Sequence, residues 1–189
     1  MAQDPFIYLY ADGGPCRVLA VAPGFEGFVL HDHGRSHLGP GVHQLECNGV
    51  AAIFQVRVGG NHHVDLRRLG GVLLRDAAGR RRPMKLLGRL VYRVERAAPL
   101  VDLLEREQIY EPRQLEGELA RLVVEQLSCV FDGEDWSAER LNVNLDVARC
   151  ELLRHLSTAL APLGLEIVDL ELLAEPLVEP TASQRIASS

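Results

Sequence analysis

The residue types that could do chemistry gather near the N-terminus, where six of the seven histidines precede residue 64. Three of them, His31, His33 and His37, lie close together in the sequence. An H-x-H pair at the end of a strand places both imidazoles on one side, as in the metal sites of cupins. A cupin also needs a glutamate soon after the second histidine, and Ser36 and His37 stand there instead. These histidines are candidate metal ligands with an incomplete pattern, so the sequence predicts no metal and no other cofactor.

A second candidate group is basic and lies in the middle of the chain. Its members, flanked by apolar residues on both sides, are Arg75, Arg80, Arg81, Arg82 and Lys85. The apolar runs 72–74 and 86–87 on either side of this polar segment predict a β-hairpin. A basic tip of this kind could contact a partner or anionic lipid headgroups, at about 1 kcal/mol per basic residue near such a surface. The alternative is a solvated hairpin whose charges keep the protein in solution.

Motifs for nucleophilic catalysis or phosphate binding do not occur in the sequence. It contains no G-x-S-x-G, no glycine-rich phosphate loop and no C-x-x-C pair. The four cysteines are far apart, at Cys16, Cys47, Cys129 and Cys150, and are expected to be reduced thiols that pack as small apolar groups. The sequence therefore predicts no catalytic residues and a protein that is not an enzyme.

The charge balance excludes some classes of partner and favours others. The 189 residues carry a formal charge of -6, so a nucleic-acid binder with a strong positive field is not expected. Residues 1–98 hold 13 basic and 8 acidic residues, whereas residues 99–189 hold 7 and 18. Such asymmetry is either an accident of the solvated surface or a feature that orients head-to-tail association between copies, and this association is the prediction to test. No run approaches the roughly 20 apolar residues of a transmembrane helix, so none is predicted.

The first half of the chain has the pattern of strands. Residues 53–58 alternate, with Phe54, Val56 and Val58 on one face, which predicts a half-buried strand. Residues 89–95 alternate in the same way, with Leu90, Tyr92 and Val94 forming the apolar set. Glycines and prolines at 23–24 and 39–41 separate the runs and predict turns.

The second half changes to a helical period. Apolar residues at three- and four-residue steps over 115–131 and 145–163 predict two long helices, with Asn144 as a cap and Gly164 as the end of the second. Alternation over 168–172 then predicts a closing strand that Pro176 ends. The expected class is α+β: a mixed, mainly antiparallel sheet with two long helices and a C-terminal strand.

The order of four motifs resembles the SPFH or band 7 domain of stomatins, prohibitins, flotillins and the HflK/HflC-type regulators. They are Gly24-Phe25-Glu26-Gly27, then Gly39-Pro40-Gly41 ahead of His43, then GRLVYRVERAAPLVDLL (88–104), then ALAPLGLEIVDLELL (159–173). Together these cover roughly residues 15–175. The resemblance implies a domain at 15–175, with an N-terminal extension at 1–14 and a disordered tail at 176–189. The family's usual membrane segment and long coiled coil have no counterpart in this sequence.

The resemblance also implies a function. The expectation is a non-enzymatic scaffold or adaptor that associates with itself or docks on another protein. The expected location is the cytoplasm, where peripheral contact with anionic lipid would bring the protein to the inner face of the membrane. The alternative is a cupin-like metal enzyme that uses the N-terminal histidines.

Overall fold

A computed structural model describes residues 4–9, 17–45, 49–66, 72–76, 78–133, 136–143 and 145–176. The N-terminal part consists of six strands, β1 (Phe6–Leu9), β2 (Arg17–Val21), β3 (Phe25–His31), β4 (Gly34–Leu38), β5 (Gly41–Leu45) and β6 (Val50–Arg57). The second sheet consists of β7 (Asn61–Asp65), β8 (Val72–Arg75), β9 (Arg81–Val94) and β10 (Leu165–Pro176). Four α-helices lie between β9 and β10 in sequence: α1 (Ala97–Arg106), α2 (Pro112–Gly133), α3 (Ala138–Val143) and α4 (Leu145–Leu160). A short 3-10 helix, Ala161–Leu163, follows α4.

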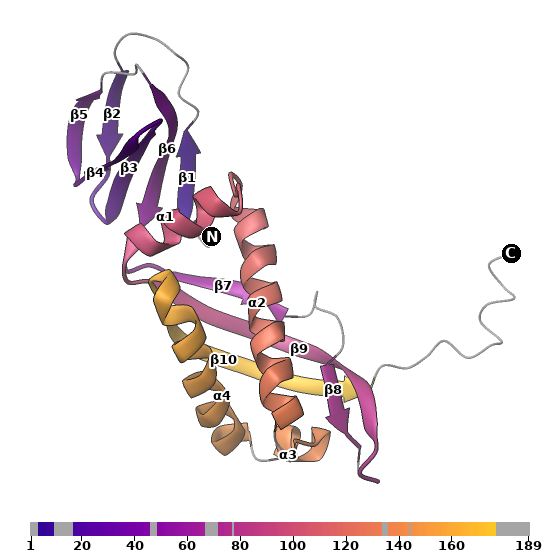
Figure 1. Ribbon diagram of the computed structural model, residues 1–189. Helices are drawn as coiled ribbons and strands as arrows, with labels where there is room; N and C mark the ends of the chain where they lie inside the picture. The colour runs from indigo at the N-terminus through magenta and orange to yellow at the C-terminus, as the bar shows by residue number, and fades with distance from the viewer. Residues whose placement is uncertain are drawn as a thin grey trace, which may run out of the picture.

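The six N-terminal strands form a small sandwich at one end of the molecule (Figure 1). One layer has the order β1-β6-β3-β4, and β2 and β5 form the other. The central strand β6 is buried on both faces, with Ile53 in a small core against β2 and β5 and Phe54 in the main core. The prediction of a half-buried strand was wrong. Gln55 alternates with apolar neighbours, as on a strand with one solvated face, but the face that carries Gln55 is packed as well. Gln55 is buried and donates a hydrogen bond to the carbonyl of Ala20.

The sheet begins earlier in the chain than the expected boundary at residue 15. Strand β1 pairs antiparallel with β6 in the register Phe6 to Val56. Phe6 is buried in the main core, and its ring lies 6.1 Å from that of Phe54. The expected extension 1–14 therefore contains a strand of the sandwich. The apolar run from Phe6 to Leu9 was the signal for it in the sequence.

The second sheet is built around β9, which pairs with β10 along one edge and with β7 and β8 along the other. The hairpin predicted around residues 75–83 is confirmed, since β8 and β9 pair antiparallel. The predicted closing strand is also confirmed as β10, but a bulge between Ile167 and Asp169 breaks its alternation. Val168 is left 42% exposed there, whereas Leu170 is buried.

The helices cover one face of the second sheet, and α1 lies beside the sandwich (Figure 1). The α+β class with mainly antiparallel strands is confirmed, but the described residues form four helices where the sequence predicted two. Short α3 was missed because a helix of six residues leaves little periodicity to detect. The band 7 resemblance implies a short helix at Pro99, and α1 lies there. The apolar stripe of α2 is buried as its spacing predicts, at Leu115, Leu119, Val123, Leu127 and Phe131.

Some expectations from the sequence fall outside the described residues. These are the cap at Asn144, the loop residues Glu134 and Asp135, Cys16, Cys47, and the disordered tail beyond Pro176. Cys129 and Cys150 are described and are exposed free thiols, so the prediction that they pack as buried apolar groups was wrong.

Gly164 lies between the 3-10 helix that follows α4 and the start of β10, and its backbone joins the start of β10 to the end of β9. Its φ of 74° is left-handed, as predicted for the end of this helix. Its carbonyl accepts hydrogen bonds from the backbone N–H groups of Glu95 and Arg96. A Cβ at this position would lie 2.0 Å from the carbonyl oxygen of Arg96. Only glycine fits both the conformation and the close backbone approach.

We therefore expect Gly164→Ala to lower the free energy of unfolding by about 1–3 kcal/mol or more, from left-handed strain and the backbone collision. The matched control is Gly117→Ala, since Gly117 is exposed inside α2 and a Cβ there meets nothing within 4 Å. That control should raise stability by up to about 1 kcal/mol through helix propensity. Urea unfolding of the two variants measures both effects, and equal changes would contradict this account of Gly164.

Candidate functional site

The candidate metal ligands do not come together. The Nε2 atom of His31 lies 3.2 Å from the hydroxyl of Ser36. The ring of His37 stacks on that of Phe28, with its Nε2 3.1 Å from a carboxylate oxygen of Glu26. His31 and His37 therefore use neighbours on different sides of the β3–β4 hairpin, and His33 is exposed in its turn. No group of three potential ligands that could hold a metal ion occurs among the described residues.

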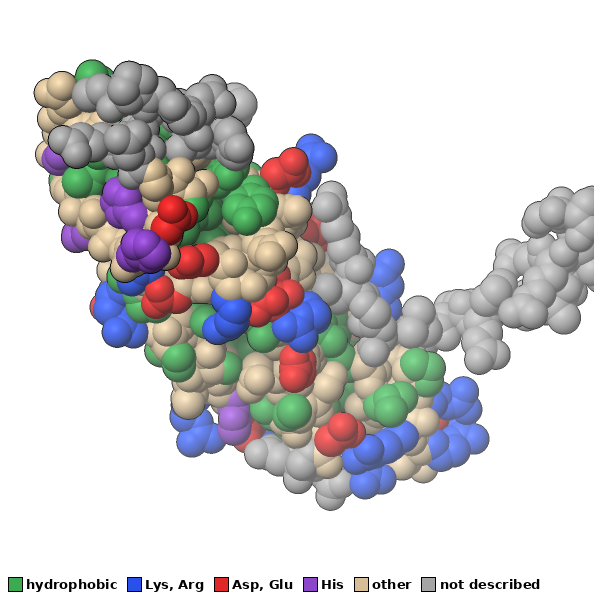
Figure 2. Space-filling model, turned by 45° about the horizontal axis from the view of Figure 1, so that its top comes forward, with side chains coloured by type: hydrophobic (Ala, Val, Ile, Leu, Met, Phe, Trp, Pro, Cys, Tyr) green, Lys and Arg blue, Asp and Glu red, His purple; other side chains and the backbone are tan. Residues whose placement is uncertain are grey.

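The basic cluster lies at the end of the molecule opposite the sandwich, where Figure 2 shows Lys and Arg side chains gathered at the β8–β9 hairpin. Asp76 organises its turn, because one carboxylate oxygen accepts hydrogen bonds from the N–H groups of Ala78 and Arg80. The other oxygen accepts from the guanidinium groups of Arg80 and Arg82. The backbone N–H of Arg80 is the largest of the causes that hold the pKa of the Asp76 carboxyl below its usual value.

The remaining members of the cluster point in different directions. Arg81 donates to Asp132 at the end of α2, at 2.8 Å. Arg75 donates to the carbonyl of Gly79. Lys85 is exposed on β9, opposite Glu175 of β10. The predicted cluster therefore consists of a turn whose arginines bind carboxylates and of Lys85, which belongs to the surface of the sheet. The bound carboxylates reduce the positive charge that is available to a lipid surface.

Part of the charge asymmetry between the two halves of the chain is neutralised by ion pairs within the fold. Four ion pairs join an arginine before residue 99 to a carboxylate after it: Arg35 with Asp102, Arg81 with Asp132, Arg89 with Glu171, and Arg93 with Glu166. These side chains are partly exposed, so each pair contributes about 1 kcal/mol or less to stability. Opposite charges that could join two copies head to tail are therefore partly used within one copy.

The face of the second sheet that points away from the helices is the most distinctive surface, and we call it the open face. Its outward side chains on β9 include Lys85, Arg89 and Arg93, and those on β10 include Glu166, Glu171 and Glu175. The strand register places them in three rows, each with a base on β9 beside an acid on β10. Hydrogen bonds from Arg93 are the main cause that holds the pKa of Glu166 below its usual range.

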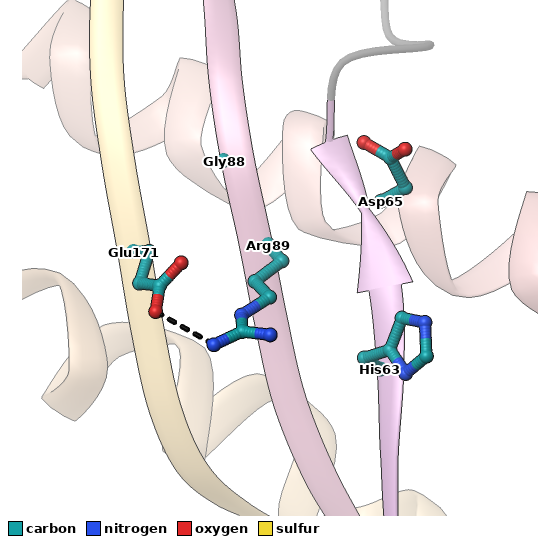
Figure 3. A pocket seen from close by; sticks show the side chains of 5 residues that line it. All are labelled: His63, Asp65, Gly88, Arg89 and Glu171. Atoms are coloured by element: carbon teal, nitrogen blue, oxygen red, sulfur yellow. Dashed lines mark hydrogen bonds and ion pairs between the residues drawn. The ribbon is translucent and has the colours of Figure 1, made fainter. Parts of the chain in front are cut away.

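A hollow of about 360 Å³ opens on this face, lined by His63, Asp65, Gly88, Arg89 and Glu171 (Figure 3). Arg89 donates to Glu171 across the two strands at 2.8 Å, and β7 brings His63 and Asp65 to the same surface. Gly88 keeps β9 and β10 close, because a Cβ there would lie 2.0 Å from the carbonyl oxygen of Glu171. With Arg89 and Glu171 already paired, the hollow suits polar contacts with another surface better than proton transfer.

Sequence reasoning did not single out the residues of the open face as a site. The signal was the alternation itself, since Arg89 and Arg93 fall on the polar side of one predicted strand and Glu171 on that of another. Which two polar sides would be neighbours depends on the strand order, which the sequence does not specify.

Comparison with known proteins adds no assignment: no protein-family model and no curated protein matches this chain. The resemblance to the band 7 family stays a prediction. Among the described helices, none is long and apolar enough to cross a bilayer.

Because the candidate histidines are held apart, we expect the purified protein to contain far less than one zinc, iron or manganese ion per chain. Elemental analysis after dialysis measures this directly. A stoichiometric metal that is lost in a His31→Ala, His37→Ala double variant would contradict it.

The turn at Asp76 should respond to acid with a definite sign. A carboxyl whose folded-state pKa is lowered stabilises the fold above its usual pKa of about 4, and this stabilisation is lost as the pH falls through the folded-state value. We expect Asp76→Asn to lower the unfolding temperature near pH 7, because asparagine keeps an acceptor oxygen but loses the charge beside Arg80 and Arg82. The difference should disappear in strong acid. A difference that stays constant with pH would exclude the charge as its cause.

Proposed function

We propose that this chain is a non-enzymatic scaffold or adaptor of band 7 type that associates with a second copy of itself through the open face. The observation that carries this proposal is the arrangement of charge there. A basic stripe of Lys85, Arg89 and Arg93 on β9 runs beside an acidic stripe of Glu175, Glu171 and Glu166 on β10, in register.

Two parallel stripes of opposite sign make a surface complementary to itself. A two-fold axis that runs along the strands between β9 and β10 places the basic stripe of each copy over the acidic stripe of the other. Such an isologous contact is the commonest symmetry of protein assemblies. Each row can then form pairs both within and between copies, and neither charge is left uncompensated when the faces meet.

Apolar side chains lie where this axis would pass. Leu87 and Leu173 are opposite each other in the register, between the rows of Lys85 and Arg89. Leu173 is 40% exposed and Leu87 is partly buried in one chain. Face-to-face packing of two sheets, at their usual separation of about 10 Å, would remove both from water. An apolar centre with a charged rim is the usual composition of an interface between proteins.

The alternative sites receive less support from the geometry. The basic hairpin has three of its arginines bonded to Asp76 and Asp132, and the N-terminal histidines do not form a ligand set in the described residues. The open face is the surface whose features favour a second copy over a membrane or a metal ion.

We expect light scattering to show a dimer at low salt that weakens as ionic strength rises, because exposed charges are screened beyond about 8–10 Å. Arg89→Glu and Glu171→Arg should each weaken self-association about tenfold or more, since each places like charges opposite each other twice in the dimer. An equimolar mixture of the two variants should recover a heterodimer, because the altered residues then face opposite charges again.

The control is Arg154→Glu, which reverses an exposed charge on α4, on the side of the sheet that the helices cover. It should leave the dimer intact. A monomer at low and high salt at micromolar concentration, or a dimer unaffected by Arg89→Glu, would overturn the proposal. Loss of self-association in each variant alone without recovery in the mixture would exclude this symmetry.

A further inference from the structure

A second cavity, of about 240 Å³, also borders β7, where three parts of the chain meet. The segment before β1 contributes Asp4, β7 contributes His62 and His63, and β9 contributes Tyr92. The first turns of α2 contribute Arg113 and Glu116. Small-ligand sites are typically concave, with a few polar groups that converge from different elements. The volume limits any occupant to a small molecule.

Two polar side chains at this cavity are almost completely buried. Tyr92 is 3% exposed and His62 is 4% exposed, with ring centroids 5.5 Å apart. Burial first, and the charge of Glu116 second, raise the pKa of Tyr92, so its hydroxyl stays protonated and able to donate. Within the described part of the chain this hydroxyl makes no hydrogen bond. The ring is buried but the hydroxyl is not fully enclosed, and the cavity that Tyr92 lines is where a ligand can reach it.

The charged residues around the cavity differ from those elsewhere on the molecule. Among the described residues, most arginines pair with carboxylates, as Arg89, Arg93 and Arg121 do. Arg113, Asp4 and Glu116 have no ion pair or hydrogen bond of their side chains among the described residues. Charges of both signs therefore line one small cavity without neutralising each other.

We propose that this cavity binds a small zwitterion that carries a carboxylate and an ammonium group, of the class of free α-amino acids. The carboxylate binds the guanidinium of Arg113, for which it is the geometrically matched anion. The ammonium group binds the carboxylates of Asp4 and Glu116. The rings of His62 and Tyr92 contact the carbon skeleton, and the Tyr92 hydroxyl donates to the carboxylate. This activity is separate from self-association, because none of these residues belongs to the charge stripes of the open face.

The experiment is an NMR titration and calorimetry of the whole protein with glycine and larger L-amino acids, and with acetate and methylammonium as the two halves of the ligand. We expect at least one amino acid to bind at millimolar concentration or below and to shift the signals of β7, β9 and the start of α2. Each half alone should bind about tenfold more weakly or worse. No shift with any amino acid, or equal affinity for acetate or methylammonium, would overturn the proposal.

Variants distinguish ligand binding in the cavity from a purely structural role of its residues. Arg113→Gln and Glu116→Gln should each weaken binding about tenfold or more, whereas Arg154→Gln, on an exposed part of α4, should not. Tyr92→Phe keeps the ring and should weaken binding while leaving the unfolding temperature of the free protein almost unchanged, because the hydroxyl has no partner among the described residues. Unchanged affinity in both Arg113→Gln and Tyr92→Phe would place the ligand elsewhere and overturn the proposal.

Discussion

The rest of the structure depends on the pairing of β9 on both of its edges. This single strand of 14 residues holds β10 along one side and β7 and β8 along the other, so it joins segments from the middle and the end of the chain. Its inner face contributes Leu86, Leu90 and Val94 to the main core, and the helices cover that face. Its outer face presents the charges of the open face. Gly88 permits the close approach of β10, because any side chain there would collide with the backbone of Glu171.

Pairing across β9 also determines where the charge of the molecule lies. The basic first half and the acidic second half meet along the β9–β10 boundary, where Arg89 and Arg93 pair with Glu171 and Glu166. The same complementarity recurs where Arg35 of β4 binds Asp102 of α1 and joins the sandwich to the helices. Residues of opposite charge that are far apart in the sequence are therefore neighbours in the fold. What remains for another molecule is a striped surface rather than two oppositely charged ends.

The two proposed sites both border β7, and His63 lines both of them. His63 and Asp65 line the hollow of the open face, whereas His62 lies on the helix side with Tyr92. This follows from the alternation of neighbouring residues along a strand. One face is suited to a flat contact with another sheet, and the other encloses a small volume between β7, β9 and α2. The neighbouring histidines therefore differ in burial, His62 being buried and His63 exposed, although both line the second cavity.

The sequence by itself determined the local elements whose patterns are strong: the alternation of β9, the buried stripe of α2, the hairpin of β8 and β9, and the left-handed end at Gly164. It did not reveal the second buried face of β6 or the short helix α3, because a few residues carry too little periodicity. The tertiary structure alone decided which charges are partners and which polar groups converge. Strand order and register bring Arg89 beside Glu171, and Asp4 to the same cavity as Glu116, across separations in sequence that no local pattern encodes. The physical reason is that propensity and periodicity act over a few residues, whereas a site depends on contacts that exist only once the whole core has packed.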